Sequence, residues 1–227
     1  MPEGLPPTAS RMGGQPFTPP YTDWPSSMIE NGTKKRPMAF IGQFNFAEIV
    51  SSVAELEGVV PNQGLLQLFY DIEECPWGTY PEDLNYFRLI WYPDIENWSH
   101  EPMAAPEPSY PEKEFGLAFS YRPSFPESPD ELNFPAELFD LYLETLVYDE
   151  HHQIAGYPLP VQSDPMEELA EGDRFGDDAP WQLLLQIDSD ERMGIMWSDT
   201  GTIYLGVKNQ TLATADLSQA LLVLQCC

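Results

Sequence analysis

Basic residues are scarce in this chain, since 10 Lys and Arg stand against 37 Asp and Glu among 227 residues. The net charge of −27 repels phosphate backbones and anionic lipid headgroups. We therefore predict no nucleic-acid and no membrane partner, and a basic protein is the partner that the charge leaves open. The short basic run at residues 34–36 is interpreted as a solvated loop before a strand. Residues 101–178 hold 19 Asp and Glu against three Lys and Arg, which predicts a concentrated acidic face.

Cysteine and long apolar runs are scarce as well. The number of cysteines is odd, and none of them has Cys-x-x-Cys spacing; they are Cys75, Cys226 and Cys227. Neither a disulfide framework nor a zinc motif is therefore expected. No segment approaches the ~18 consecutive apolar residues of a membrane span, and the first ten residues lack the apolar core of a signal peptide. We expect a soluble cytoplasmic protein, and no motif indicates a cofactor.

The chain nevertheless has the composition of a folded protein, with 42% apolar and 13% aromatic residues. Its 24 prolines are dispersed, which favours many turns and short elements. One helix is expected to begin near Pro135 and to carry Leu138, Leu141, Tyr142 and Leu146 on one stripe. Two further helices are expected at 47–56 and 163–172. Apolar runs predict strands at 37–46, 65–71, 86–92, 117–121, 181–188, 202–207 and 221–226.

Two distant stretches of the chain resemble each other. "AFIGQFNF" and "QLLLQIDS" align Gln43 with Gln186, and each is followed by a turn containing Gly and then by another apolar strand. This pattern indicates a degenerate duplication. We predict an α+β, β-rich fold in which two degenerate structural repeats form one domain. The halves are placed at about 37–92 and 181–226, and an acidic, Pro-rich and helical segment at 93–180 joins them.

The tripeptide Asp-Thr-Gly at 199–201 has the sequence that carries a catalytic carboxylate in aspartic proteases. Such an enzyme needs two carboxylates that share one proton. The matching position of the first repeat is Asn-Gln-Gly at 62–64, which supplies no carboxylate. Between two strands, Asp-Thr-Gly is also an ordinary turn sequence. We therefore predict a turn at 199–201.

Eight blocks of sequence, in this order, resemble the YwqG-like bacterial family, long catalogued as a domain of unknown function. The resemblance implies an α+β fold with duplicated halves and an ordered domain over 10–227, preceded by a flexible N-terminus at 1–9. It implies no particular activity. The blocks are "SRMGGQPF" (10–17), "WP" (24–25), "PMAFIGQFNFAEI" (37–49), "GLLQLFYD" (64–71), "HQIAGYPLPVQSD" (152–164), "LLLQIDSDE" (183–191), "MWSDTGTIYLGV" (196–207) and "LQC" (224–226).

Polar residues near the predicted strands are candidate binding residues. Gln43 and Gln186 interrupt apolar strands, so they either cross-link the two halves or form the polar floor of a pocket. The run Asp-Glu-His-His at 149–152 is not expected to bind metal, because zinc ligands converge from separated positions. The acidic residues at 188–191 do not fit a calcium loop. The candidates are Gln43, His152, Gln162, Gln186, Asp188, Asp190 and Trp197.

Three functions agree with these observations. The first is a binding or protein-interaction module without catalysis. The second is a hydrolase of unrecognised type that uses His152 with the carboxylates near 188–190. The third is an antidote or immunity-type protein that binds a basic partner through residues 101–178. A hydrolase requires His152 and a carboxylate to meet in a cleft, whereas an antidote requires a continuous acidic face.

Overall fold

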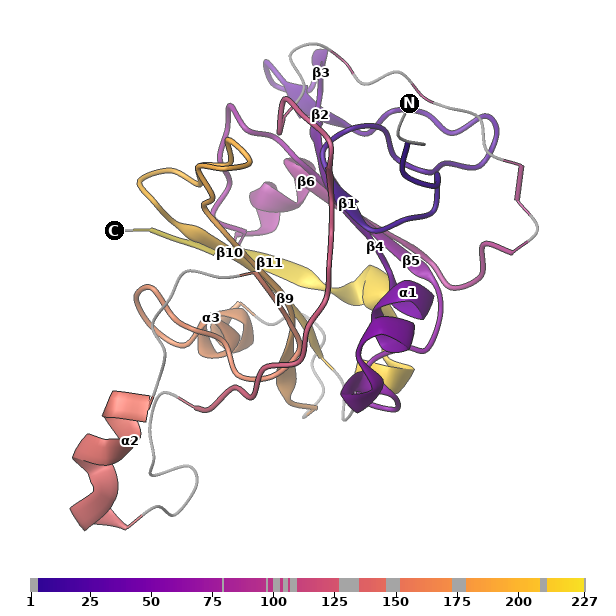
Figure 1. Cartoon of the computed structure of the whole chain (residues 1–227). Coiled ribbons are helices and arrows are strands. Elements are labelled where there is room, and N and C mark those ends of the chain that lie inside the picture. Colours follow the sequence, from indigo (N-terminus) through magenta and orange to yellow (C-terminus); the bar gives the residue numbers. More distant parts are fainter. Residues whose placement is uncertain are drawn as a thin grey trace.

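The structure is a computed structural model in which short helices surround antiparallel sheets (Figure 1). The predicted α+β, strand-rich class is confirmed. In the part of the chain that the structure describes, the α-helices are α1 (Phe46–Ser52), α2 (Phe139–Thr145) and α3 (Pro165–Glu171). The described residues are 4–78, 80–96, 98–99, 103, 106, 110–126, 135–145, 152–172, 179–208 and 212–226. Within them, no helix has both the length and the apolar character needed to cross a membrane.

The first main sheet is antiparallel, with the strand order β6-β5-β4-β1-β7. A separate hairpin, β2 (Ser26–Ile29) and β3 (Lys34–Pro37), follows β1 in the chain. Residues 34–36 therefore belong to a strand, and their interpretation as a loop was wrong. The strands of the sheet are β1 (Arg11–Met12), β4 (Ala39–Asn45), β5 (Leu65–Tyr70), β6 (Phe87–Tyr92) and β7 (Phe115–Gly116).

The second main sheet is also antiparallel and has the order β11-β10-β9-β8. Its three long strands agree closely with the predicted ranges. The strand predicted at 117–121 does not form, because that stretch runs on from the two-residue strand β7 without ladder pairing. The strands are β8 (Gln153–Ile154), β9 (Trp181–Asp188), β10 (Thr202–Lys208) and β11 (Leu221–Gln225).

One buried apolar cluster contains side chains of both main sheets, so the two sheets share a core. In β10 and β11 successive side chains alternate between this core and the opposite face, and both faces are buried. The outer face of the second sheet is covered by α3, where Leu169 packs with Leu183, Tyr204 and Val223. Members of the shared core include Ile41, Phe44, Leu66 and Leu68 of the first sheet and Leu184, Ile187, Ile203 and Leu205 of the second.

The two sheets have matching strand orders, β6-β5-β4-β1 and β11-β10-β9-β8. Gln43 lies opposite Arg11 of β1, and Gln186 lies opposite Gln153 of β8, so the two glutamines occupy matching positions. This match supports the interpretation of a duplication, which stays a prediction together with the domain limits. At the predicted boundary between residues 9 and 10, the side chains of Gln43 and Asn45 in β4 donate hydrogen bonds to the backbone carbonyls of residues 7–9.

Residues 110–126 form a strap that passes both sheets (Figure 1). At one end of the strap, β7 pairs with β1. Near the other end, Ser124 accepts a hydrogen bond from the backbone N–H of Tyr157, just after β8, at 2.9 Å. The strap then leads toward α2, which projects away from the sheets.

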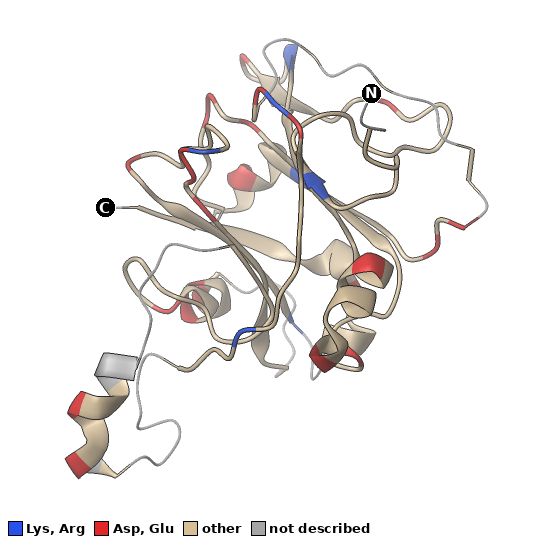
Figure 2. Cartoon of the chain, in the orientation of Figure 1, with Lys and Arg blue, Asp and Glu red and all other residues tan. Residues whose placement is uncertain are grey.

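Acidic residues are spread over loops and over all three helices, whereas basic residues are few (Figure 2). Acidic side chains therefore occur around both sheets. Of the 19 Asp and Glu in residues 101–178, ten lie outside the described residues. The predicted concentrated acidic face stays a prediction.

Candidate functional site

Gln43 holds the N-terminal segment against the outer face of the first sheet. Its side-chain oxygen accepts a hydrogen bond from the backbone N–H of Phe17 at 2.8 Å. Its amide nitrogen donates to the carbonyls of Pro7 and Ala9, each at 2.8 Å. The neighbouring Gln67 donates to the carbonyl of Phe17 at 2.6 Å. Both backbone groups of Phe17 are thus bound by side chains of the sheet, and the buried amide of Gln43 uses both its oxygen and its nitrogen.

Gln186 makes the corresponding contact in the second sheet. Its side-chain oxygen accepts a hydrogen bond from the backbone N–H of Leu159 at 2.9 Å. The carbonyl of Leu159 accepts from the hydroxyl of Tyr204 at 2.7 Å, and Tyr204 lies opposite Gln186 on β10. In these contacts Gln43 and Gln186 fasten the segments that cover their own sheets. They neither cross-link the two halves nor line the cavity described below.

The covering segments themselves have related sequences, "RMGGQPF" at 11–17 and "QIAGYPL" at 153–159. In both, two successive residues have positive φ: 66° and 72° at Gly13 and Gly14, and 57° and 82° at Ala155 and Gly156. A Cβ on Gly14 or on Gly156 would collide with a side chain of the strap. The sequence comparison missed this pair of segments because it was anchored on the strands. The shared Gly-x-Pro-apolar pattern could have revealed it.

His152, Asp188 and Asp190 meet at the edge of the second sheet, as the hydrolase hypothesis requires. His152 Nδ1 accepts the backbone N–H of Asp188 at 3.3 Å, and its Nε2 lies 3.4 Å from Asp190 Oδ2. Arg192 also contacts Asp190, with Nε at 3.0 Å from Oδ1, and these hydrogen bonds lower the pKa of Asp190 to about 2. Asp188 Oδ1 accepts from Thr202 Oγ1 at 3.0 Å.

This arrangement opposes a role of His152 as a general base. A neutral imidazole has one N–H donor and one acceptor nitrogen. Because Nδ1 accepts from the backbone, the proton of neutral His152 lies on Nε2, where it points to Asp190. In a hydrolase triad the acceptor nitrogen faces the nucleophile instead. The acceptor nitrogen of His152 is therefore occupied by the Asp188 backbone.

The side chains of Gln162 and Trp197 lie apart from His152. Gln162 donates to the carbonyl of Cys226 at 2.6 Å and so joins the loop after β8 to the end of β11. Trp197 is buried in the core, with its ring 5.4 Å from that of Tyr70 and 6.0 Å from that of Tyr110. The structure therefore brings together four predicted residues, His152, Gln186, Asp188 and Asp190. The backbone of Trp197 lies next to them, since its N–H donates to Ser189 Oγ at 2.9 Å, but its side chain belongs to the core.

The turn predicted at 199–201 is confirmed, since the N–H of Gly201 donates to the carbonyl of Trp197 at 2.7 Å and Asp199 is exposed. Asp149, Glu150 and His151 lie outside the described residues. Over the rest of the chain that the structure describes, no three His, Cys, Asp or Glu side chains are grouped to hold a metal ion.

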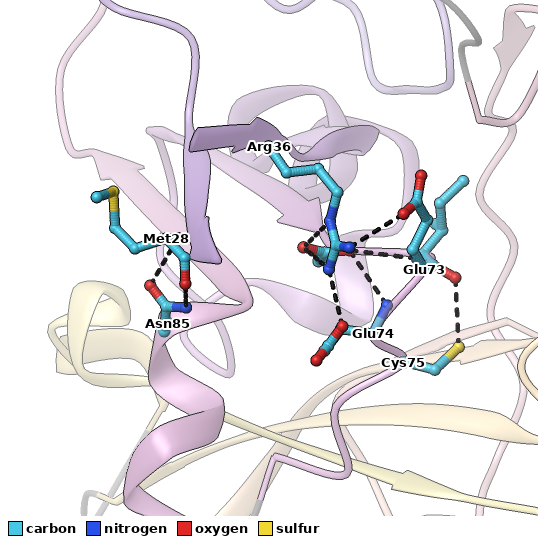
Figure 3. A network of polar contacts seen from close by, with 8 residues as sticks. Met28, Arg36, Glu73, Glu74, Cys75 and Asn85 are labelled. Carbon is cyan, nitrogen blue, oxygen red and sulfur yellow. Dashed lines mark hydrogen bonds and ion pairs between the residues drawn. The ribbon is translucent and has the colours of Figure 1, made fainter. Parts of the chain in front are cut away.

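Arg36 is the centre of an ion-pair network that the sequence did not predict (Figure 3). Its Nε donates to Asp71 Oδ2 at 2.9 Å, its Nη1 to Glu73 at 3.0 Å and its Nη2 to Glu74 at 2.9 Å. Burial lowers the pKa of Arg36, but hydrogen bonds to Glu74 and Asp71 more than offset this effect and raise the pKa above its usual value. The buried Asp71 carboxylate also accepts two backbone N–H groups, which fix the turn after β5.

A cavity of about 120 Å³ lies beside this network. Its walls come from the β2–β3 hairpin, the start of β4, the turn after β5, and Pro106, Tyr110 and Pro111, which are far apart in the sequence. Charged and aromatic side chains line it together. The lining includes Trp24, Arg36, Phe40, Asp71, Glu73 and Tyr110.

Comparisons with known proteins give a family but no activity. The search of curated proteins found no match. Residues 10–226 match the model of one family, which is the range of the resemblance described above. The YwqG-like name and a bacterial origin stay predictions. Because the match covers nearly the whole sequence, the chain belongs to the family described as a domain of unknown function, DUF1963.

Proposed function

We propose that this protein is a non-catalytic protein-interaction module that binds a basic partner through α2. The observation that carries the proposal is the exposed apolar surface of this projecting helix. Leu138, at its start, and Phe139 are each 41% exposed, and Leu141 is 55% exposed. Large apolar side chains gathered on one short segment typically mark an interaction surface.

Among the side chains of α2 that the structure describes, Tyr142 is buried and holds the helix to the strap. Tyr142 donates a hydrogen bond to the carbonyl of Pro126 at 2.5 Å, and its ring packs edge-on against Phe125 at 6.3 Å. The exposed Leu138 and Leu141 are an i, i+3 pair that comes just before this anchor in the chain. The anchor supports a helix that keeps its position while its apolar residues remain available to a partner.

Charge indicates the chemistry of the partner. Glu137 and Asp140 are exposed at the start of the helix. At about 100° per residue, Asp140 lies at least about 100° from both Leu138 and Leu141, and Glu137 lies at the edge of the apolar stripe beside Leu141. An amphipathic helix of this kind fits an apolar groove, in the helix-in-groove mode of recognition. Lys or Arg at the rim of the groove would complement the acidic residues.

The occupied acceptor nitrogen of His152 supports the non-catalytic part of the proposal over the hydrolase hypothesis. The antidote hypothesis is a special case of the same proposal, in which the basic partner is a toxic enzyme. Loss of the partner's activity on binding would identify that case.

Titration of purified basic proteins encoded beside the gene tests the proposal. We expect one of them to bind, and Leu138→Ser/Leu141→Ser to weaken binding at least about tenfold, because central apolar contacts dominate interfaces. Val59→Ser/Leu84→Ser, which changes exposed apolar residues elsewhere, should leave binding unchanged. Glu137→Gln/Asp140→Asn should slow association and reduce its salt dependence. The absence of any basic binder, or equal binding by the α2 and control variants, would refute the proposal.

A further inference from the structure

We propose that the cavity beside Arg36 binds a cationic group, either a guanidinium or an alkylammonium. The end of an arginine or lysine side chain and a small free amine share this chemistry. The inference does not depend on α2, because the cavity is built by the hairpin, the first sheet, and Pro106, Tyr110 and Pro111.

The charges around the cavity favour a second cation. Asp71, Glu73 and Glu74 bring three negative charges to the single positive charge of Arg36, so the network has a net charge of −2. In their described contacts Glu73 and Glu74 use one carboxylate oxygen each, and both side chains are exposed. Glu73 lines the cavity, so its second oxygen is available to a ligand there, and Glu74 adds its charge from the next position of the same turn.

Asp71 gives the site its fixed part. Its side chain is 2% exposed, and its oxygens accept Arg36 and the backbone N–H groups of Glu73 and Glu74. These bonds hold the two glutamates on one turn, so little ordering is needed when a ligand binds. The positive end of Arg36 is in turn directed at carboxylates and is not free to bind an anion.

The walls of the cavity suit a cation with an apolar stem. Trp24, Phe40 and Tyr110 present aromatic rings, which attract cations through their faces. Trp24 is positioned by a hydrogen bond from its Nε1 to the carbonyl of Met38 at 2.8 Å. Tyr110 is positioned by its hydroxyl, which donates to the carbonyl of Met196 at 3.0 Å.

The size of the cavity sets the size of the ligand. Its volume of about 120 Å³ is below the ~300–1,000 Å³ of pockets that enclose drug-sized ligands. It therefore suits the end of one side chain better than a nucleotide or a folded element. A guanidinium would meet the carboxylates with its planar donors, which match carboxylate geometry.

Titration with methylguanidinium at constant ionic strength tests the inference. The readout is the NMR signal of the Trp24 indole N–H, assigned by its loss in Trp24→Phe. We expect a saturable shift of this signal, and at least about tenfold weaker binding by Glu73→Gln/Glu74→Gln, since charged hydrogen-bond partners are lost. The matched control is Glu55→Gln/Glu57→Gln, which removes the same charge at exposed positions near α1 and should bind like the natural protein.

The second arm identifies the source of the cation. An arginine-containing tripeptide that binds more tightly than methylguanidinium assigns the cavity to a protein side chain, and equal affinity assigns it to a small amine. A linear, non-saturating shift, or equal weakening by both pairs of substitutions, overturns the inference. Because none of these substitutions touches α2, failure here and failure of the proposed helix interaction are distinguishable.

Discussion

Replacement of Gln43 by methionine tests how the covering segment contributes to stability. Methionine has a similar length and no branch, so Gln43→Met removes the amide while it largely fills the same space. The backbone N–H of the buried Phe17 loses its acceptor, and the carbonyls of Pro7 and Ala9 lose a donor. The side chain of residue 43 itself is fully buried.

The expected loss follows from these three bonds. An unsatisfied buried group costs about 1–3 kcal/mol, and each bond that water can replace costs about 0.5–1.5 kcal/mol. Phe17 belongs to the first kind, and the partly exposed carbonyls of Pro7 and Ala9 belong to the second. We therefore expect Gln43→Met to lower the free energy of unfolding by about 2–6 kcal/mol. Gln186→Met should also lower the free energy of unfolding, by at least about 1–3 kcal/mol, because it removes the acceptor of the Leu159 N–H and the donor to Asp188 Oδ1.

Urea unfolding, followed by tryptophan fluorescence and far-ultraviolet circular dichroism, measures these differences. The midpoint should fall while the slope against urea stays constant, because the surface exposed on unfolding is unchanged. Gln15→Met makes the same chemical change at an exposed position and should shift stability by less than about 0.5 kcal/mol. If Gln43→Met were as stable as Gln15→Met, the covering segment would not be held by this amide.

Three further changes have defined outcomes. Hydrogen bonds from Arg192 hold the pKa of Asp190 at about 2, below its usual 3.8. The stability that the Asp190 carboxylate contributes is therefore fully present above pH 3.8 and is lost as the pH falls toward 2. Asp190→Asn should therefore lower the free energy of unfolding at pH 7 by about 1 kcal/mol. This is less than the full pKa shift implies, because Arg192 is exposed to solvent. The variant should also lose this pH dependence in its unfolding curves. Gly78→Ala should lower the free energy of unfolding by about 2 kcal/mol or more. The φ angle of Gly78 is +93°, and a Cβ at this position would lie 1.9 Å from the carbonyl oxygen of Leu222. An unchanged melting temperature would contradict this prediction. Asp199→Asn should stay within about 1 kcal/mol of the natural protein in the same assay, because asparagine suits the same exposed turn.

Local patterns in the sequence predicted most of the elements of the fold. The long strands and the helices at α1 and α3 could be predicted because their apolar spacing and capping residues are local signals. The stripe of Leu138, Leu141 and Tyr142 predicted a helix, but periodicity does not indicate which members of a stripe find a packing partner. Only Tyr142 does so among these three.

The ion-pair network and the cavity could not be predicted, because both depend on long-range pairing. Arg36 and Asp71 are 35 residues apart and meet only after the β2–β3 hairpin folds against the first sheet. The sequence alone therefore indicated only a solvated loop at 34–36. The cluster at His152 could be predicted more easily. Asp188 and Asp190 lie at the end of a predicted strand, and two of the family blocks, at 152–164 and 183–191, contain the cluster.

The strap at residues 110–126 has a consequence for synthesis on the ribosome. The first sheet is complete only when β7 has been made. Its core-forming face then stays uncovered until the strands of the second sheet have been synthesised. About one hundred residues separate β7 from β11, which takes about 5–20 s at ~5–20 residues per second. During this interval a nascent chain with a finished half exposes Ile41, Phe44, Leu66 and Leu68, side chains that are buried in the complete protein. Chaperone capture of ribosome-bound chains should therefore be strongest for lengths between these two strands.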